Sequence, residues 1–162
     1  MRHFVRPVAV GLVAIGFAIG APGVHAMSSG DDSQSAQPQK KSTYAQAVDK
    51  VKARDFQGAI GLLKQVVAAE PSNTDALNYL GYSFRESGDL KNALTYYQRA
   101  LAIDPNHKGA NEYLGELYVR LGDLPKAEAQ LAKLDRLCSF GCAEYEELKR
   151  QVAALRKKKQ GS

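Results

Sequence analysis

The chain has 162 residues, of which 44% are hydrophobic and 24% are charged, so it has enough apolar side chains for one domain with a core. This composition excludes a wholly disordered polyelectrolyte. The formal net charge is +5; without residues 1–26 the chain keeps 20 basic and 17 acidic residues, a net charge of +3, which is too balanced to argue for nucleic-acid binding.

The first 26 residues are typical of a secretory signal peptide. Arg2 and Arg6 make a short basic start, and residues 7–24 carry no charge. Pro22 and Gly23 then break the apolar run, and Ala26 is a small residue suited to a signal-peptidase site. The alternative is an uncleaved membrane anchor, which four glycines and two prolines in the stretch disfavour. We therefore expect cleavage after Ala26 and no stable membrane span afterwards, with the periplasm favoured over secretion from the cell.

Residues 27–42 are interpreted as a flexible polar linker. From 28 to 42 the only apolar side chain is Ala36, so the segment cannot bury enough surface to offset the loss of chain entropy.

Beyond the linker the sequence repeats with a period of 34 residues, which is typical of a helical solenoid. Positions with the same residue type, or with large apolar residues, recur at this spacing: Ala59, Ala93 and Ala127; Asp55, Asp89 and Asp123; Phe56, Leu90 and Leu124; Gly81 and Gly115; Gly88 and Gly122; Pro71 and Pro105.

Within residues 74–107 each recurring residue type has a structural task. Gly88 follows a first helix at a position that suits a left-handed C-cap, and Asp89 is placed to cap a second helix. Pro105 ends that second helix. The spacing predicts that the second helix buries the following apolar residues: Leu90, Ala93, Leu94, Tyr97, Ala100, Leu101 and Ile103.

This pattern resembles the tetratricopeptide repeat. The middle copy carries it most fully, in Leu-Gly-Tyr-Ser-Phe (80–84), Gly-Asp-Leu (88–90) and Asp-Pro-Asn (104–106). The resemblance implies an all-α fold: a right-handed superhelix (α-solenoid) of about three helix-turn-helix units over residues 43–137, with repeats at about 40–73, 74–107 and 108–141. In the first copy Gln46, Ala47 and Lys50 stand where Leu, Gly and an aromatic residue are usual, which leaves open whether its first helix is frayed.

The period stops at about residue 143, and residues 143–158 read as a capping helix with a basic tail to 162. Tyr145, Leu148, Val152 and Leu155 form one apolar stripe that could cover the last repeat. The basic run at 156–159 is interpreted as a solvated tail; the alternative is a contact with a membrane surface or cell wall.

Cys138 and Cys142 are the two cysteines of the chain, and export favours a disulfide between them. The alternative is a thiol-redox or soft-metal site. A redox pair is usually Cys-x-x-Cys, and the mature chain offers only His107 and Met27 as further soft ligands. We therefore favour a structural disulfide over an accessory protein that uses these cysteines for redox or metal chemistry.

The residues do not indicate an enzyme. No serine or cysteine is linked by a known motif to His107, the one histidine after residue 26. Glu112 and Glu116 share a helix face, which could suggest acid–base or hard-metal chemistry, but a charged groove wall is the simpler interpretation. We expect no catalytic residue, no metal and no cofactor.

The resemblance implies a protein that binds another protein or a peptide segment in a concave groove formed by the first helices of its repeats. The positions that it assigns to the groove are Asn78, Tyr79, Tyr82, Arg85, Glu86, Glu112, Tyr113, Glu116 and Arg120. An alternative role for Tyr79 and Tyr113 is helix packing. The basic-asparagine clamp that some members use for a terminal carboxylate is not matched, since Tyr44, Val48, Tyr79 and Gly109 occupy its positions. Weak self-association through the first repeat is a further possibility.

Overall fold

The computed structural model describes residues 41–139 and 141–161. These residues form the helices α1 (Thr43–Lys52), α2 (Phe56–Ala69), α3 (Thr74–Glu86), α4 (Leu90–Ile103), α5 (Lys108–Leu121), α6 (Leu124–Leu137) and α7 (Ala143–Gln160). The expected signal peptide over 1–26 and residues 27–40 of the linker lie outside the described residues. None of the described helices combines the length and the apolar character that crossing a membrane requires.

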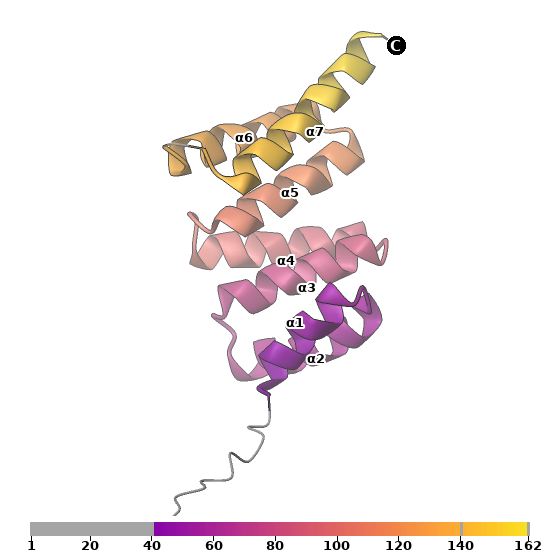
Figure 1. Ribbon diagram of the computed structural model, residues 1–162, viewed down its shortest axis with the longest axis vertical. Coiled ribbons are helices and arrows are strands. Elements are labelled where there is room, and N and C mark those ends of the chain that lie inside the picture. Colours follow the sequence, from indigo (N-terminus) through magenta and orange to yellow (C-terminus); the bar gives the residue numbers. More distant parts are fainter. Residues whose placement is uncertain (1–40, 140, 162) are drawn as a thin grey trace, which may run out of the picture. The chain divides into compact units, whose positions relative to one another are not determined.

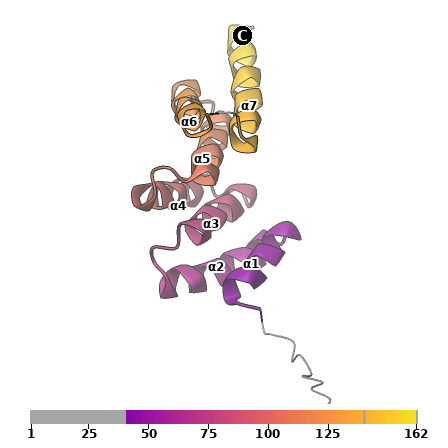
Figure 2. The same ribbon diagram turned by 60° about the vertical axis from the view of Figure 1, so that its left-hand side comes forward.

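The helices pack as successive antiparallel pairs, α1 with α2, α3 with α4 and α5 with α6, and each pair packs on the next (Figure 1). The first helices also contact one another, α1 with α3 and α3 with α5. Figure 2 shows α2, α4 and α6 along one side and α1, α3 and α7 along the other. Because α7 packs on both α5 and α6, it closes the last repeat as a capping helix. The described part is thus an all-α solenoid.

The recurring aspartates and glycines shape the turn inside each pair. Asp55, Asp89 and Asp123 each accept a hydrogen bond from the backbone N–H three residues ahead and so cap α2, α4 and α6. One residue before each aspartate the backbone has positive φ, at 59° for Arg54, 88° for Gly88 and 72° for Gly122. In the first repeat an arginine therefore occupies a left-handed position that glycine occupies in the others, which costs about 1 kcal/mol.

The first helix is formed despite its unusual sequence. Ser42 caps α1 by accepting a hydrogen bond from the N–H of Ala45, and Ala47 is fully buried. The sequence expectation for α4 was wrong at one position: Ile103, in its last turn, is 47% exposed. Ile103 lies on the apolar stripe of α4, but it is the last residue of the helix and lies beyond the part that the neighbouring helices cover.

The residue type at the position of Gly81 and the residue type that faces it on the second helix change together from one repeat to the next. A Cβ on Gly81 would lie 2.7 Å from ring atoms of Tyr97, so glycine is what admits this fully buried ring. One period earlier the two positions hold Ala47 and Leu63, both fully buried. One period later a Cβ on Gly115 would collide with Leu148 of α7. The first repeat therefore has alanine instead of glycine at position 47, and the side chain that it faces, Leu63, is smaller than the tyrosine of the middle repeat.

Candidate functional site

A hollow of about 590 Å³ opens between α3, α5 and α7. We call it the α3–α5–α7 groove and define it by the residues that line it: Tyr82, Arg85, Glu86, Glu112, Tyr113, Glu116, Val119, Arg120, Glu147 and Gln151. The first helices of the last two repeats supply its floor and one wall, and the capping helix supplies the other wall. The lining combines aromatic rings with charged side chains, which can give a bound segment both contact area and polar partners.

Arg85 is the central side chain of the groove floor and is only 6% exposed. Its Nη1 donates to the carboxylate of Glu116, which is 8% exposed, and its Nη2 lies 3.4 Å from Oε1 of Glu86. The guanidinium carbon lies 5.2 Å from the ring centre of Tyr82 and 5.3 Å from that of Tyr113. Burial alone would lower the pKa of Arg85, but Tyr97 and the two carboxylates raise it above its usual value. Arg85 is therefore a fixed cation that joins α3 to α5.

Further hydrogen bonds connect α7 to the residues of the groove floor. Nε2 of Gln151 donates to Glu116 Oε1 at 2.6 Å and to Glu147 Oε1 at 2.9 Å. At the other side of the groove, Nη1 of Arg120 donates to the backbone oxygen of Arg85 at 2.8 Å, and its Nη2 donates to Glu86 at 3.2 Å. Glu116 thus receives hydrogen bonds from both α3 and α7 and has a counter-ion. The sequence placed Glu116 in the groove; the structure shows that it is buried there as part of the scaffold.

Glu112 differs from Glu116 although it lies on the same helix face, one turn away. Its side chain is half-buried in the groove wall, and it has neither a hydrogen bond nor an ion pair with any described residue. Burial, together with the negative charges of Glu116, Glu144 and Glu147, raises the pKa of Glu112 from 4.5 to about 7. Burial and the charge of Glu112 likewise raise the pKa of Tyr113. Glu112 is thus a carboxyl group that changes charge near neutral pH inside the groove.

Two of the expected groove residues lie elsewhere. Asn78 is 5% exposed and does not line the groove; its amide nitrogen lies 3.1 Å from the point where a Cβ on Gly109 would stand. Tyr79 packs against the core and against the ring of Tyr44, with ring centres 6.3 Å apart. Both side chains instead pack between helices, because neighbouring helices cover that face of α3. The other seven expected residues line the groove together. Three lining residues were not expected: Val119 of α5, and Glu147 and Gln151, which were missed because α7 lies outside the repeat.

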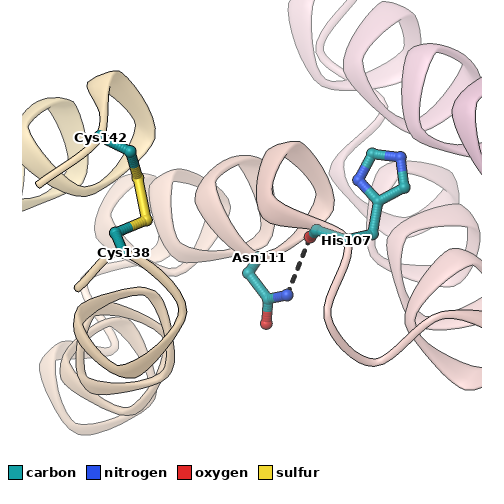
Figure 3. Close-up of a disulfide and its surroundings, with 4 residues drawn as sticks. All are labelled: His107, Asn111, Cys138 and Cys142. Atoms are coloured by element: carbon teal, nitrogen blue, oxygen red, sulfur yellow. Dashed lines mark hydrogen bonds between the residues drawn. A yellow bond between two sulfur atoms is a disulfide. The ribbon is translucent and has the colours of Figure 1, made fainter. Parts of the chain in front are cut away.

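The two cysteines are joined by a disulfide, with their Cα atoms 5.6 Å apart, and Gly141 between them has φ of 81° (Figure 3). The bond links the end of α6 to the start of α7. The ring of His107 points away from the disulfide, and its Nε2 lies 2.9 Å from Asp75 of α3. Its Nδ1 accepts a hydrogen bond from the N–H of Ala110, so His107 caps α5. No group of three or more His, Cys, Asp or Glu side chains within the described residues is arranged to hold a metal ion.

The stacked helix pairs and their groove are the architecture of a helical-repeat protein, and sequence comparison identifies the family. Tetratricopeptide repeat models match residues 44–108 and residues 84–152, and the chain belongs to the tetratricopeptide repeat family. A search of curated protein sequences gave no match.

Solved structures share the fold. Pseudomonas aeruginosa PcrH in complex with the chaperone binding region of PopD is 19% identical, with a TM-score of 0.65, over 72% of this chain and 90% of that chain. The Yersinia enterocolitica type III secretion chaperone SycD, in complex with a peptide of the translocator YopD, is 17% identical, with a TM-score of 0.63, over 72% and 92% of the two chains. The first such domain of Spaghetti (RPAP3), bound to an HSP90 peptide, is 17% identical, with a TM-score of 0.63, over 70% and 90%. At these identities the likeness concerns the fold.

Proposed function

We propose that this protein is an exported scaffold, without catalytic activity, that binds a peptide segment or a protein partner in the α3–α5–α7 groove. The observation that carries the proposal is the groove lining, where two tyrosine rings and several charged side chains from three helices surround one hollow. Tyrosine offers a large contact area at a low cost in side-chain entropy, and charged groups give orientation and specificity.

The structural neighbours support the same kind of binding. PcrH, SycD and RPAP3 were each solved with a peptide or with a binding region of a partner, on a fold that this chain shares. Export rests on the signal-peptide pattern of residues 1–26, and we assign the mature protein to the periplasm on that ground. The absence of catalytic activity is inferred from the single histidine after residue 26 and from the lack of a nucleophile motif.

A pair of adjacent charge reversals on α7 tests the groove. Glu147 lines the groove, whereas Glu146 is exposed; each carboxylate pairs with a basic residue three positions ahead, Lys149 or Arg150. Glu147→Lys and Glu146→Lys therefore change the charge of the same helix equally, and each breaks one surface ion pair; Glu147→Lys also removes the groove acceptor of one Gln151 hydrogen bond. The tagged mature protein and both variants are used to capture partners from an envelope extract, and their folding is checked by circular dichroism.

We expect a specific partner that the wild type and Glu146→Lys retain and that Glu147→Lys loses. Equal capture by all three proteins would reject the groove as the binding site. Loss of capture in Glu146→Lys alone would place binding on the exposed face of α7 instead.

A further inference from the structure

The side chains that line the groove carry more negative charges than positive charges. Four glutamates face two arginines there, and both arginines are already engaged. Arg85 is held by Glu116 and Glu86, while Arg120 bonds to the backbone of Arg85 and to Glu86. An acidic ligand would therefore have to compete with groove carboxylates for guanidinium groups that are already bound.

Glu112 is the carboxylate that this arrangement leaves without a cation. It is half-buried in the wall of the hollow and has no hydrogen-bond or ion-pair partner among the described residues, whereas Glu116, one turn away, has both. A partly buried carboxylate without a partner costs stability. Such groups are typical of functional sites, where a ligand supplies the missing partner.

The aromatic side chains that line the hollow with Glu112 suit the apolar stem of a long cationic side chain. The rings of Tyr82 and Tyr113 line the hollow, with centres 5.0 Å apart and planes inclined by 42°. They already lie against the guanidinium of Arg85, so what they offer a ligand is apolar contact area rather than a second cation site. A bare metal ion is a poorer candidate, because no three acidic or other metal-binding side chains converge within the described residues.

We propose that the groove takes a lysine or arginine side chain of the partner segment, with its cationic head against the carboxylate of Glu112 and its stem along Tyr113. The proposal rests on the proposed function and narrows it to partners with a basic segment. The Glu112 carboxylate accepts one or two charge-assisted hydrogen bonds, and the apolar stem covers the tyrosine ring.

The protonation of Glu112 makes this binding depend on pH. In the free protein its pKa is about 7, and binding of a cation favours the charged form. Affinity is therefore expected to fall about tenfold between pH 8 and pH 6, as the ionised fraction falls. The charged and titratable groups that face Glu112 come from its own helix and from α3 and α7: Tyr113, Glu116, Arg85, Glu144 and Glu147.

The test uses a library of octapeptides with one randomised charged position, applied to the mature wild-type protein, to Glu112→Gln and to Glu146→Gln. Glutamine keeps the shape of the side chain and removes its charge, and Glu146 supplies a matched control because it is an exposed carboxylate on α7. We expect bound peptides to be enriched in lysine or arginine over aspartate or glutamate about 10- to 100-fold at pH 8. The enrichment should persist in Glu146→Gln, weaken at pH 6 and disappear in Glu112→Gln.

Three other results would overturn the proposal in distinguishable ways. Enrichment of acidic or uncharged peptides that Glu147→Lys abolishes would reject the cationic ligand and keep the groove as a peptide site. Capture of no peptide at either pH would reject both this inference and the proposed binding of peptide segments. A lysine or arginine preference that survives in Glu112→Gln would move the cation to another carboxylate and contradict the assignment of Glu112.

Discussion

The matched sizes of Gly81 and Tyr97 predict a large cost for adding one methyl group. A Cβ at position 81 would lie 2.7 Å from two carbon atoms of the Tyr97 ring, which is fully buried. Overpacking of this kind costs about 3 kcal/mol, while alanine gains about 1 kcal/mol over glycine within a helix. We therefore expect Gly81→Ala to lower the free energy of unfolding by about 2 kcal/mol, measured by urea titration with circular dichroism.

Gly61 supplies the matched control, because it lies within α2 and an added Cβ meets no atom within 4 Å. Gly61→Ala should raise the free energy of unfolding by up to about 1 kcal/mol. In a Tyr97→Leu background, which reproduces the alanine–leucine pair of the first repeat, Gly81→Ala should no longer destabilise the protein. Equal losses in the two backgrounds would refute the steric argument, since the cost would then arise elsewhere than at the ring.

Three further predictions concern the groove and its cap. Glu116→Ala leaves the buried Arg85 without its main counter-ion and should cost about 3–5 kcal/mol by urea titration; a loss below about 1 kcal/mol would mean that water replaces the carboxylate. The pKa of Glu112 is raised from 4.5 to about 7 in the folded state, so the wild type loses stability as the pH rises through this range. Glu112→Gln should therefore be more stable at pH 8, by about 1–2 kcal/mol because solvent screens part of the effect at this half-exposed group, with no difference at pH 4; urea titrations at both pH values would reveal any contrary trend. Serine at both Cys138 and Cys142 should lower the free energy of unfolding by about 2 kcal/mol at most, because the disulfide closes a loop of only about five residues; a much larger loss would assign it more than a local role.

The helices and their turns could be predicted from the sequence because their determinants are local. Gly88 adopts positive φ and Asp89 caps the next helix, as their places in the 34-residue period indicate. The capping helix follows from its apolar stripe, and Leu148 and Val152 in that stripe are buried. Each of these features depends on residues a few positions apart along the chain.

The site was only partly predictable because it depends on contacts between repeats. The family register places Arg85 and Glu116 in the groove, but their ion pair joins residues 31 positions apart, and burial turns them into parts of the scaffold. Register also assigned Asn78 to the groove, although neighbouring helices cover it. Glu147 and Gln151 carry no periodic signal, because the capping helix follows no repeat. Only the packing of α7 brings them to the groove.

The most direct measurement of the central claim is amide hydrogen exchange of the mature protein with and without the captured partner segment. The account predicts added protection in α3, α5 and the first half of α7, where the residues that line the groove lie, and unchanged exchange in α2, α4 and α6. Protection confined to α2, α4 and α6 would contradict the account, because binding would then take place away from the groove.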